Sequence, residues 1–228
     1  MGVCLRIGAF ASGGGTNLQS IIDHCEAGAI DAQVVLVVSN RPDAGALERA
    51  QRHGIPREVV PVGKDLSETF HGADRRHVEL LRQHRVDLVC LAGYMRRIGP
   101  EVLRAYPRAV LNIHPALLPS FPGTHGQRDA VEWGVKVSGA TVHFADEEFD
   151  RGPIIIQAAV PVLPGDDEDS LAARILRQEH RIYPQAIQWF AEGRLKLDGR
   201  RVYLDPPSRG SFEALEPGVI ISPPLEID

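Results

Sequence analysis

Near-continuous apolar runs recur along the first half of this chain, and segments with helical spacing of apolar residues separate them. The runs lie at residues 3–10, 33–39, 59–60, 86–91 and 109–112. The helices between them are expected at residues 17–27, from an Asp43 cap to about Gly54, at 74–84 and from Pro100 onward. Strands buried on both faces have such uninterrupted apolar sequences, and strands alternating with helices are typical of parallel sheets. The sequence therefore predicts an open, mostly parallel, twisted α/β sheet with helices on both faces.

The pattern changes after Pro119, where antiparallel strands are expected. The expected elements are a helix at 127–133, strands at 138–144 and 153–162, and a long amphipathic helix at 169–192. Pro184 should bend that helix or end its first half, because proline removes a backbone donor and crowds the preceding turn. The segment 206–228 contains two Pro-Pro pairs and little periodicity. We expect a surface or disordered tail there.

Composition limits the classes of partner. The chain has 228 residues with 43% hydrophobic and 24% charged residues, which is ordinary for a globular protein. A net charge of -5 argues against a general nucleic-acid binder, although a local basic pocket remains possible. The longest apolar runs are far too short to span a membrane. The three cysteines form no C-x-x-C motif, and we expect reduced thiols in a cytoplasmic protein.

One strand end carries two candidate catalytic side chains. Asn112 and His114 lie two positions apart at the end of an apolar run, so they share one face of the expected strand. An amide donor beside a titratable donor suits acyl transfer to an amine, because negative charge develops on the carbonyl oxygen. The plainer alternative is a hydrogen-bonded core histidine and an asparagine that serves the following turn.

A glycine-rich turn joins the first run to the first helix, at Ser12 to Asn17. Free backbone N–H groups at a helix N-terminus form an anion site, so a phosphate or phosphoribosyl group is the favoured ligand. The turn lacks a Walker A lysine. It also differs from a dinucleotide fingerprint, because its glycines are contiguous and the second run ends in Ser39-Asn40 rather than an acidic residue. A tight turn without a ligand is the alternative.

Two further segments point to the same edge of the sheet. Residues 92–100 follow the fourth run, and ligands in open α/β sheets bind beyond the carboxyl ends of strands. The acidic segment 146–150 reads as a solvated loop by composition alone. Asp150, however, could be the carboxylate partner that a protonated imidazole needs. His114, His125 and His143 lack the short spacing of a zinc site, so metal binding is a weaker hypothesis. His77 lies in a charged helix and is expected to be solvated.

Several of these segments resemble the folate-dependent phosphoribosylglycinamide (GAR) formyltransferases, over about residues 6–202. The motifs that carry the resemblance are residues 12–19, 91–96, 111–119 and 150–157, with Gln178-Glu179-His180 and Tyr183-Pro184. The resemblance implies a Rossmann-like formyltransferase fold in a single domain at residues 1–205. Residues 1–110 would form its nucleotide-binding half and residues 111–205 its catalytic and folate-binding half.

The resemblance also implies a reaction and its residues. The formyl group of 10-formyltetrahydrofolate, a co-substrate, would pass directly to the amine of GAR in purine biosynthesis, without a metal. Asn112 and His114 would stabilise the oxyanion, and Asp150 would keep His114 protonated. The residues expected to bind GAR are Gly14, Gly15, Thr16, Asn17 and Glu179. Those expected to bind folate are Met95, Arg96, Arg97, Ile98, Asp146, Glu147 and Asn112.

This chain departs from the family pattern at two positions. Phe70 stands where many relatives carry a folate-side arginine, and Lys64, Arg75 or Arg76 are candidate substitutes. Arg151 replaces a glycine beside Asp150, where it could compete for that carboxylate or hold the glutamate of the folate.

Two other functions remain open at this point. One is hydrolysis of 10-formyltetrahydrofolate, whose enzymes resemble this chain but carry an extra N-terminal domain; here the first strand is expected from residue 3. The other is a non-catalytic nucleotide- or folate-binding module. The expected partners are small-molecule substrates, with no nucleic acid and no membrane, in a monomer or homodimer.

Overall fold

The computed structural model describes residues 4–63, 68–208 and 218–227. The chain divides into two compact units, residues 1–112 and 113–228, and each is described by itself. Among the described residues, no helix is long and apolar enough to cross a membrane.

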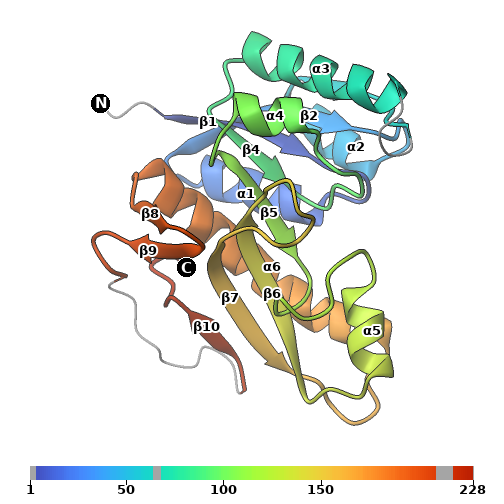
Figure 1. Cartoon of the computed structure of the whole chain (residues 1–228), viewed down its shortest axis with the longest axis vertical. Helices are drawn as coiled ribbons and strands as arrows, with labels where there is room; N and C mark the ends of the chain where they lie inside the picture. Colours follow the sequence, from blue (N-terminus) through green and yellow to red (C-terminus); the bar gives the residue numbers. More distant parts are fainter. Residues whose placement is uncertain (1–3, 64–67, 209–217, 228) are drawn as a thin grey trace. The chain divides into compact units, whose positions relative to one another are not determined.

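The first unit is a parallel sheet with helical connections (Figure 1). Its strands are ordered β3-β2-β1-β4-β5 and all neighbours run parallel. Its elements are β1 (Leu5–Phe10), α1 (Thr16–Glu26), β2 (Ala32–Ser39), α2 (Gly45–Arg52), β3 (Arg57–Val59), α3 (Glu68–Gln83), β4 (Leu88–Leu91), α4 (Pro100–Ala105) and β5 (Val110–His114). The last two residues of β5 belong to the second unit. The alternation expected from the sequence is confirmed.

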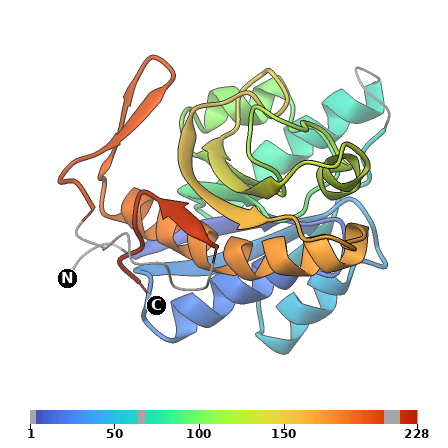
Figure 2. The same ribbon diagram turned by 90° about the horizontal axis from the view of Figure 1, so that it is seen from below.

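The helices of this unit cover both faces of the sheet. Figure 2 shows α1 and α2 on one face and α3 and α4 on the other. The strands between them are buried, as their uninterrupted apolar runs predict, and Ile7, Phe10 and Leu36 are fully enclosed.

Two local expectations in the first unit are wrong. The N-cap of α2 is Ala44, without a side-chain cap, because Asp43 instead forms an ion pair with Arg41 at 2.7 Å. His77 is buried rather than solvated, with ring contacts to Phe10 and Tyr94. Its charged neighbours Arg75, Arg76 and Glu79 are exposed, so the composition of the segment did not show that His77 itself is buried.

The second unit is built around an antiparallel pair. β6 (Val137–Phe144) and β7 (Ile154–Pro161) run antiparallel, and α6 (Glu168–Ala191) packs against both. α5 (Gly126–Glu132) packs against α6. The expected antiparallel strands are therefore confirmed.

α6 does not end at Pro184. The whole helix has 24 residues and ends at Ala191. Proline in a helix interior costs about 3 kcal/mol. Here Pro184 is buried, and it lies among the buried residues Tyr183, Gln185 and Ile187. Because burial of this face stabilises the helix on the strands, packing outweighs the missing hydrogen bond.

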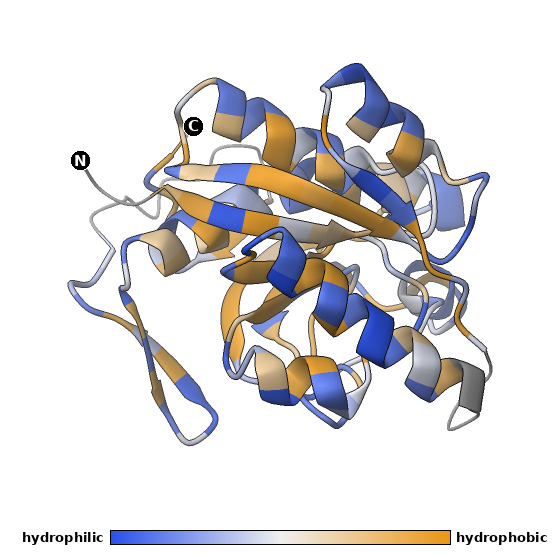
Figure 3. Ribbon diagram, turned by 90° about the horizontal axis from the view of Figure 1, so that it is seen from above, coloured by the Kyte–Doolittle hydropathy of each residue, from blue (hydrophilic) through white to orange (hydrophobic). Residues whose placement is uncertain are grey.

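The hairpin β8 (Leu195–Asp198) and β9 (Arg201–Leu204) was not expected from the sequence. Figure 3 shows hydrophobic and hydrophilic residues alternating along it, as is typical of a strand pair with one polar face. β9 meets β7 in a parallel bridge between Arg201 and Ile154.

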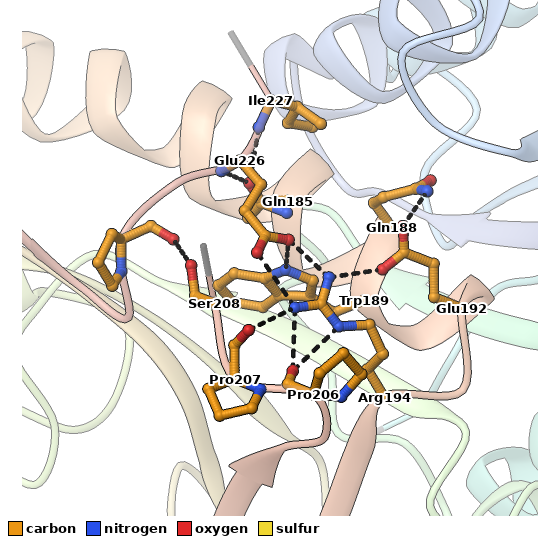
Figure 4. A network of polar contacts seen from close by, with 11 residues as sticks. Gln185, Gln188, Trp189, Glu192, Arg194, Pro206, Pro207, Ser208, Glu226 and Ile227 are labelled. Carbon is orange, nitrogen blue, oxygen red and sulfur yellow. Dashed lines mark hydrogen bonds and ion pairs between the residues drawn. The ribbon is translucent and has the colours of Figure 1, made fainter. Parts of the chain in front are cut away.

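The described residues of the segment 206–228 make specific contacts. β10 (Ile220–Ser222) pairs antiparallel with β7. Figure 4 shows a polar network in which the Glu226 carboxylate accepts from Trp189 Nε1 and from Arg194, at 2.9 and 2.6 Å. Gln185 Oε1 accepts from the backbone N–H groups of Glu226 and Ile227. These contacts connect the end of the chain to α6.

Candidate functional site

The glycine loop after β1 has a backbone conformation that requires glycine at one position. Gly15, the N-cap of α1, has φ of 73°, and a Cβ there would lie 2.8 Å from the Cα of Ala46. The loop is also held by α2: Ala46 N donates to Gly13 O at 3.1 Å, and Arg49 Nε donates to Gly14 O at 2.7 Å. Contacts from α2 therefore hold the turn in its observed backbone geometry.

Ser12 connects the glycine loop to the ends of two neighbouring strands. Its hydroxyl donates to Asn40 Oδ1 at 2.6 Å and accepts from Met95 N at 2.8 Å. Its backbone N–H donates to Gly93 O at 3.0 Å. These bonds join the segments that follow β1, β2 and β4, as expected where the carboxyl ends of parallel strands meet.

A cavity of about 420 Å³ opens at this edge. Its lining residues are Ser12, Gly13, Gly14, Gly15, Thr16, Asn17, Asn40, Arg41, Ala92, Gly93, Met95 and Arg96. Backbone N–H groups at the start of a helix and two guanidinium groups suit an anionic ligand. The structure thus brings together residues 14–17, Met95 and Arg96, which the sequence predicted as binding residues.

Some members of this cavity were missed from the sequence, and some predicted residues are not in it. Asn40 and Arg41 were missed, although their place directly after the second apolar run was a usable signal. Arg97 and Ile98 do not line the cavity. Arg97 is exposed and Ile98 is half-buried.

The second unit brings His114 and Asp150 together. His114 Nδ1 lies 3.5 Å from Asp150 Oδ2, and both side chains are buried, with exposures of 4% and 2%. His114 Nε2 lies 2.8 Å from the carbonyl oxygen of Phe121. Both ring nitrogens thus face oxygen atoms that can accept a hydrogen bond from an N–H group.

Asp150 is held in place by its surroundings. Gly123 N donates to Asp150 Oδ2 at 2.8 Å. Asp150 has φ of 55°, a conformation that aspartate adopts more readily than most residues. A Cβ at Gly152 would overlap the carbonyl oxygen of Phe144, so the chain must pass there without a side chain. The local sequence Asp-Arg-Gly-Pro therefore sets the position of the carboxylate.

A second histidine lies on the other side of this carboxylate. His143 Nε2 is 3.9 Å from Asp150 Oδ1, and its Nδ1 is 2.9 Å from the carbonyl oxygen of Phe144. Burial lowers the pKa of His143, while its hydrogen bond to Phe144 and the charge of Asp150 act in the opposite direction. His143 is therefore best described as a neutral neighbour of the His114–Asp150 pair.

Arg151 turns away from that pair. It is 71% exposed and forms an ion pair with Glu148 at 3.5 Å. The described contacts of Arg151 therefore do not support the expectation that it competes with His114 for Asp150.

The other predicted residues lie where their types suggest. Asn112 is half-buried in β5 and pairs in register with Leu91 of β4. Glu179 is buried in α6, with 6% exposure. Asp146 and Glu147 are exposed in the acidic loop. The sequence-based roles of these residues remain predictions.

The position of the expected folate-side arginine is part of the core. Phe70 is buried and has an edge contact with His71. Of the candidate substitutes, Arg75 and Arg76 are exposed, and Arg76 pairs with Glu79 at 3.2 Å. Lys64 lies outside the described residues. Among the residues described, no group of three or more histidine, cysteine or acidic side chains could hold a metal ion.

Comparison with known proteins identifies the family. The sequence model of the formyl transferase family matches residues 5–187. A phosphoribosylglycinamide formyltransferase from Escherichia coli is 44% identical over 88% of this chain and 94% of the relative. The chain belongs to the phosphoribosylglycinamide formyltransferase family.

Solved structures of this formyltransferase family have the same fold. A glycinamide ribonucleotide transformylase from Symbiobacterium toebii aligns with a TM-score of 0.84 and 53% identity, over 88% of this chain and 93% of that one. A formyltetrahydrofolate deformylase from Pseudomonas syringae also aligns, with a TM-score of 0.82. It is only 29% identical, and 66% of its chain is covered. The family, fold class and enzyme class predicted from the sequence are therefore confirmed.

Proposed function

We propose that this formyltransferase transfers the formyl group from 10-formyltetrahydrofolate to the amine of GAR in purine biosynthesis. The products are formylglycinamide ribonucleotide and tetrahydrofolate. The observation that carries the proposal is the buried His114–Asp150 pair, directly beyond Asn112 on β5. The family match and the fold support the same activity.

The proposed reaction passes through a tetrahedral intermediate. The amine nitrogen attacks the formyl carbon, the carbonyl oxygen becomes negative, and the bond from the carbon to folate N10 breaks. The amine loses a proton and N10 gains one. Asn112 and His114 donate to the oxygen, and one such donor is typically worth about 2.7–4 kcal/mol of barrier. Asp150 stabilises the imidazolium through Nδ1.

The Phe121 carbonyl competes for the catalytic proton. It lies 2.8 Å from His114 Nε2, the nitrogen that would donate to the formyl oxygen. One N–H cannot donate fully to both oxygens, so substrate binding should displace or lengthen this contact.

Substrate binding is divided between named groups. Residues 14–17 and Arg41 would bind the phosphate of GAR, because they line a cavity at the N-terminus of α1 and Arg41 adds positive charge there. Glu179 would accept from the ribose hydroxyls or the glycinamide end. Residues 95–98, Asn112, Asp146 and Glu147 would bind the folate. No metal takes part in this proposal.

The proposal extends to domain organisation and setting. Residues 1–205 would act as a single formyltransferase domain, with nucleotide binding from residues 1–110 and catalysis and folate binding from 111–205. Residues 206–228 would form a proline-rich surface segment, whose described part pairs with β7 and contacts α6. We propose a cytoplasmic monomer or homodimer that acts on small molecules, with no nucleic-acid or membrane partner.

A spectrophotometric assay of folate deformylation tests this function. The protein is mixed with 10-formyltetrahydrofolate, with and without GAR, beside His114→Ala and Asp150→Asn. Turnover only with GAR, and strongly reduced in both variants, is the expected result. Turnover without GAR would instead identify a hydrolase. Folate binding without any turnover would identify a non-catalytic module.

A further inference from the structure

Hydrogen bonds from α2 determine how the peptide groups of the glycine loop are oriented. Its two middle carbonyl oxygens accept hydrogen bonds from α2: Gly13 O from Ala46 N at 3.1 Å, and Gly14 O from Arg49 Nε at 2.7 Å. The first donor is part of the backbone. The second is a side chain, so a single substitution can remove it.

The Arg49 bond determines which way one peptide group faces. In a trans peptide the C=O and N–H groups point in opposite directions. Because Gly14 O is directed at Arg49, the N–H of Gly15 is directed away from α2. Gly14 and Gly15 both line the cavity. The peptide between them therefore has its donor side available for an anion.

Without Arg49 this peptide would have little to hold it. Both of its residues are glycines, which allow backbone orientations that other residues exclude. The reversed peptide would present a carbonyl oxygen, the negative end of its dipole, to the ligand. A phosphate would be repelled by that oxygen, whereas it is attracted by an N–H group.

Arg49 is well placed for this role. It is half-buried in α2, and its Nη1 also donates to Gln19 Oε1 at 3.2 Å, so the guanidinium bridges the loop and α1. Arg49 is not among the residues that line the cavity. It would therefore act on a ligand through the loop.

We propose that Arg49 is a positioning residue that sets the affinity and selectivity of this enzyme for the phosphate group of its substrate. The inference rests on the proposed function, in which the glycine loop binds the phosphate of GAR. Arg49 holds the Gly14–Gly15 peptide with its N–H toward the phosphate.

Arg49→Met is the main test variant, because methionine retains an unbranched chain like the aliphatic part of arginine but has no hydrogen-bond donor. Arg49→Lys restores one donor and the charge. Gln19→Met is the matched control, because it removes the other acceptor of Arg49 and leaves the bond to Gly14 intact. Thermal unfolding of all variants establishes that they fold.

The kinetic readout compares GAR with its dephosphorylated form, glycinamide riboside. Arg49→Met should raise KM for GAR about tenfold, the effect of roughly one hydrogen bond to a charged group. KM for the riboside and kcat for GAR should change little. Arg49→Lys should recover part of the loss, and Gln19→Met should match the wild type. A purely structural role would raise KM for both substrates together, and that result would overturn the inference.

Calorimetric titration with ribose 5-phosphate separates this inference from the proposed function, because it needs no turnover. Weaker binding in Arg49→Met than in the wild type, with Gln19→Met unchanged, is expected. Equal binding in all variants would overturn the inference alone. If the wild type neither binds ribose 5-phosphate nor prefers GAR over the riboside, the phosphate role of the loop fails, and the inference with it.

Discussion

The two candidate sites of this molecule are built in different ways. The glycine loop of the first unit is continuous in sequence, and its recognition groups are backbone N–H groups held by contacts to α2. The His114–Asp150 pair of the second unit joins side chains from two distant segments, around a carboxylate in an unusual backbone conformation. A backbone site should tolerate changes of side chain but not an added Cβ. A side-chain site should lose its chemistry with a single truncation.

Truncation at His114 should have the largest effect. In His114→Ala, kcat should fall by roughly 10²–10⁴-fold, because a positioned proton donor is lost. KM for both substrates should change by no more than a few fold. Steady-state kinetics test this, with Arg151→Gly as a matched control, since Arg151 lies beside Asp150 but turns toward Glu148. If kcat of His114→Ala fell by less than tenfold, the catalytic role of His114 would be contradicted.

His77, the buried histidine of the first unit, should affect the stability of the protein rather than its kcat. Burial lowers the pKa of His77 to about 4 from 6.5, and among the described residues its Nε2 has no hydrogen-bond partner. In the unfolded chain His77 binds a proton near pH 6.5, whereas in the folded chain it binds one only near pH 4. Stability should therefore fall as the pH drops through this window, by up to about 3 kcal/mol.

His77→Leu removes the contribution of His77 to the pH dependence of stability. It leaves that of Asp74 on the same helix, where burial raises the pKa of the carboxyl group. Urea unfolding at pH 7 and at pH 4.5 should show a smaller difference in the free energy of unfolding for the variant than for the wild type. Equal pH dependence of the two proteins would show that His77 takes up its proton in the same pH range in the folded and the unfolded chain. kcat at pH 7 should not change.

An added Cβ tests the backbone site. Gly15→Ala places a Cβ against Ala46 at a φ of 73°, which should cost about 1–3 kcal/mol of stability and raise KM for GAR. Gly72→Ala in α3 is the control, because Gly72 does not line the cavity and its added Cβ would meet no neighbouring side chain within 4 Å. Thermal unfolding and KM for GAR distinguish the two. Equal effects at both positions would argue against a fixed loop geometry.

The smallest effect is expected at the end of the chain. Glu226→Gln weakens the network with Trp189 and Arg194, which should cost about 1 kcal/mol of stability. Urea unfolding measures this loss, and steady-state kinetics should show an unchanged kcat. A large loss of activity would show that the anchoring of this segment matters for catalysis.

Much of this protein was readable from local pattern. The parallel strands of the first unit were predicted because each is an apolar run buried on both faces. Asn112 and His114, and the loop at residues 14–17, were found because their chemistry lies within a few consecutive residues. Arg49 was not found, because an arginine on a helix carries no local signal of what its side chain contacts. Arg41 was missed although it directly follows the second apolar run.

The sequence alone determined the order of strands and helices as far as α6, the glycine-rich turn and the side chains available for acyl transfer. These follow from short-range periodicity and from residue type. Only the tertiary structure decided that His77 is buried, that α6 continues through Pro184 and that Glu226 reaches Trp189. It also decided that Arg49 holds the glycine loop. Each of these depends on contacts between residues or elements that local sequence pattern does not specify, because packing brings the partners together.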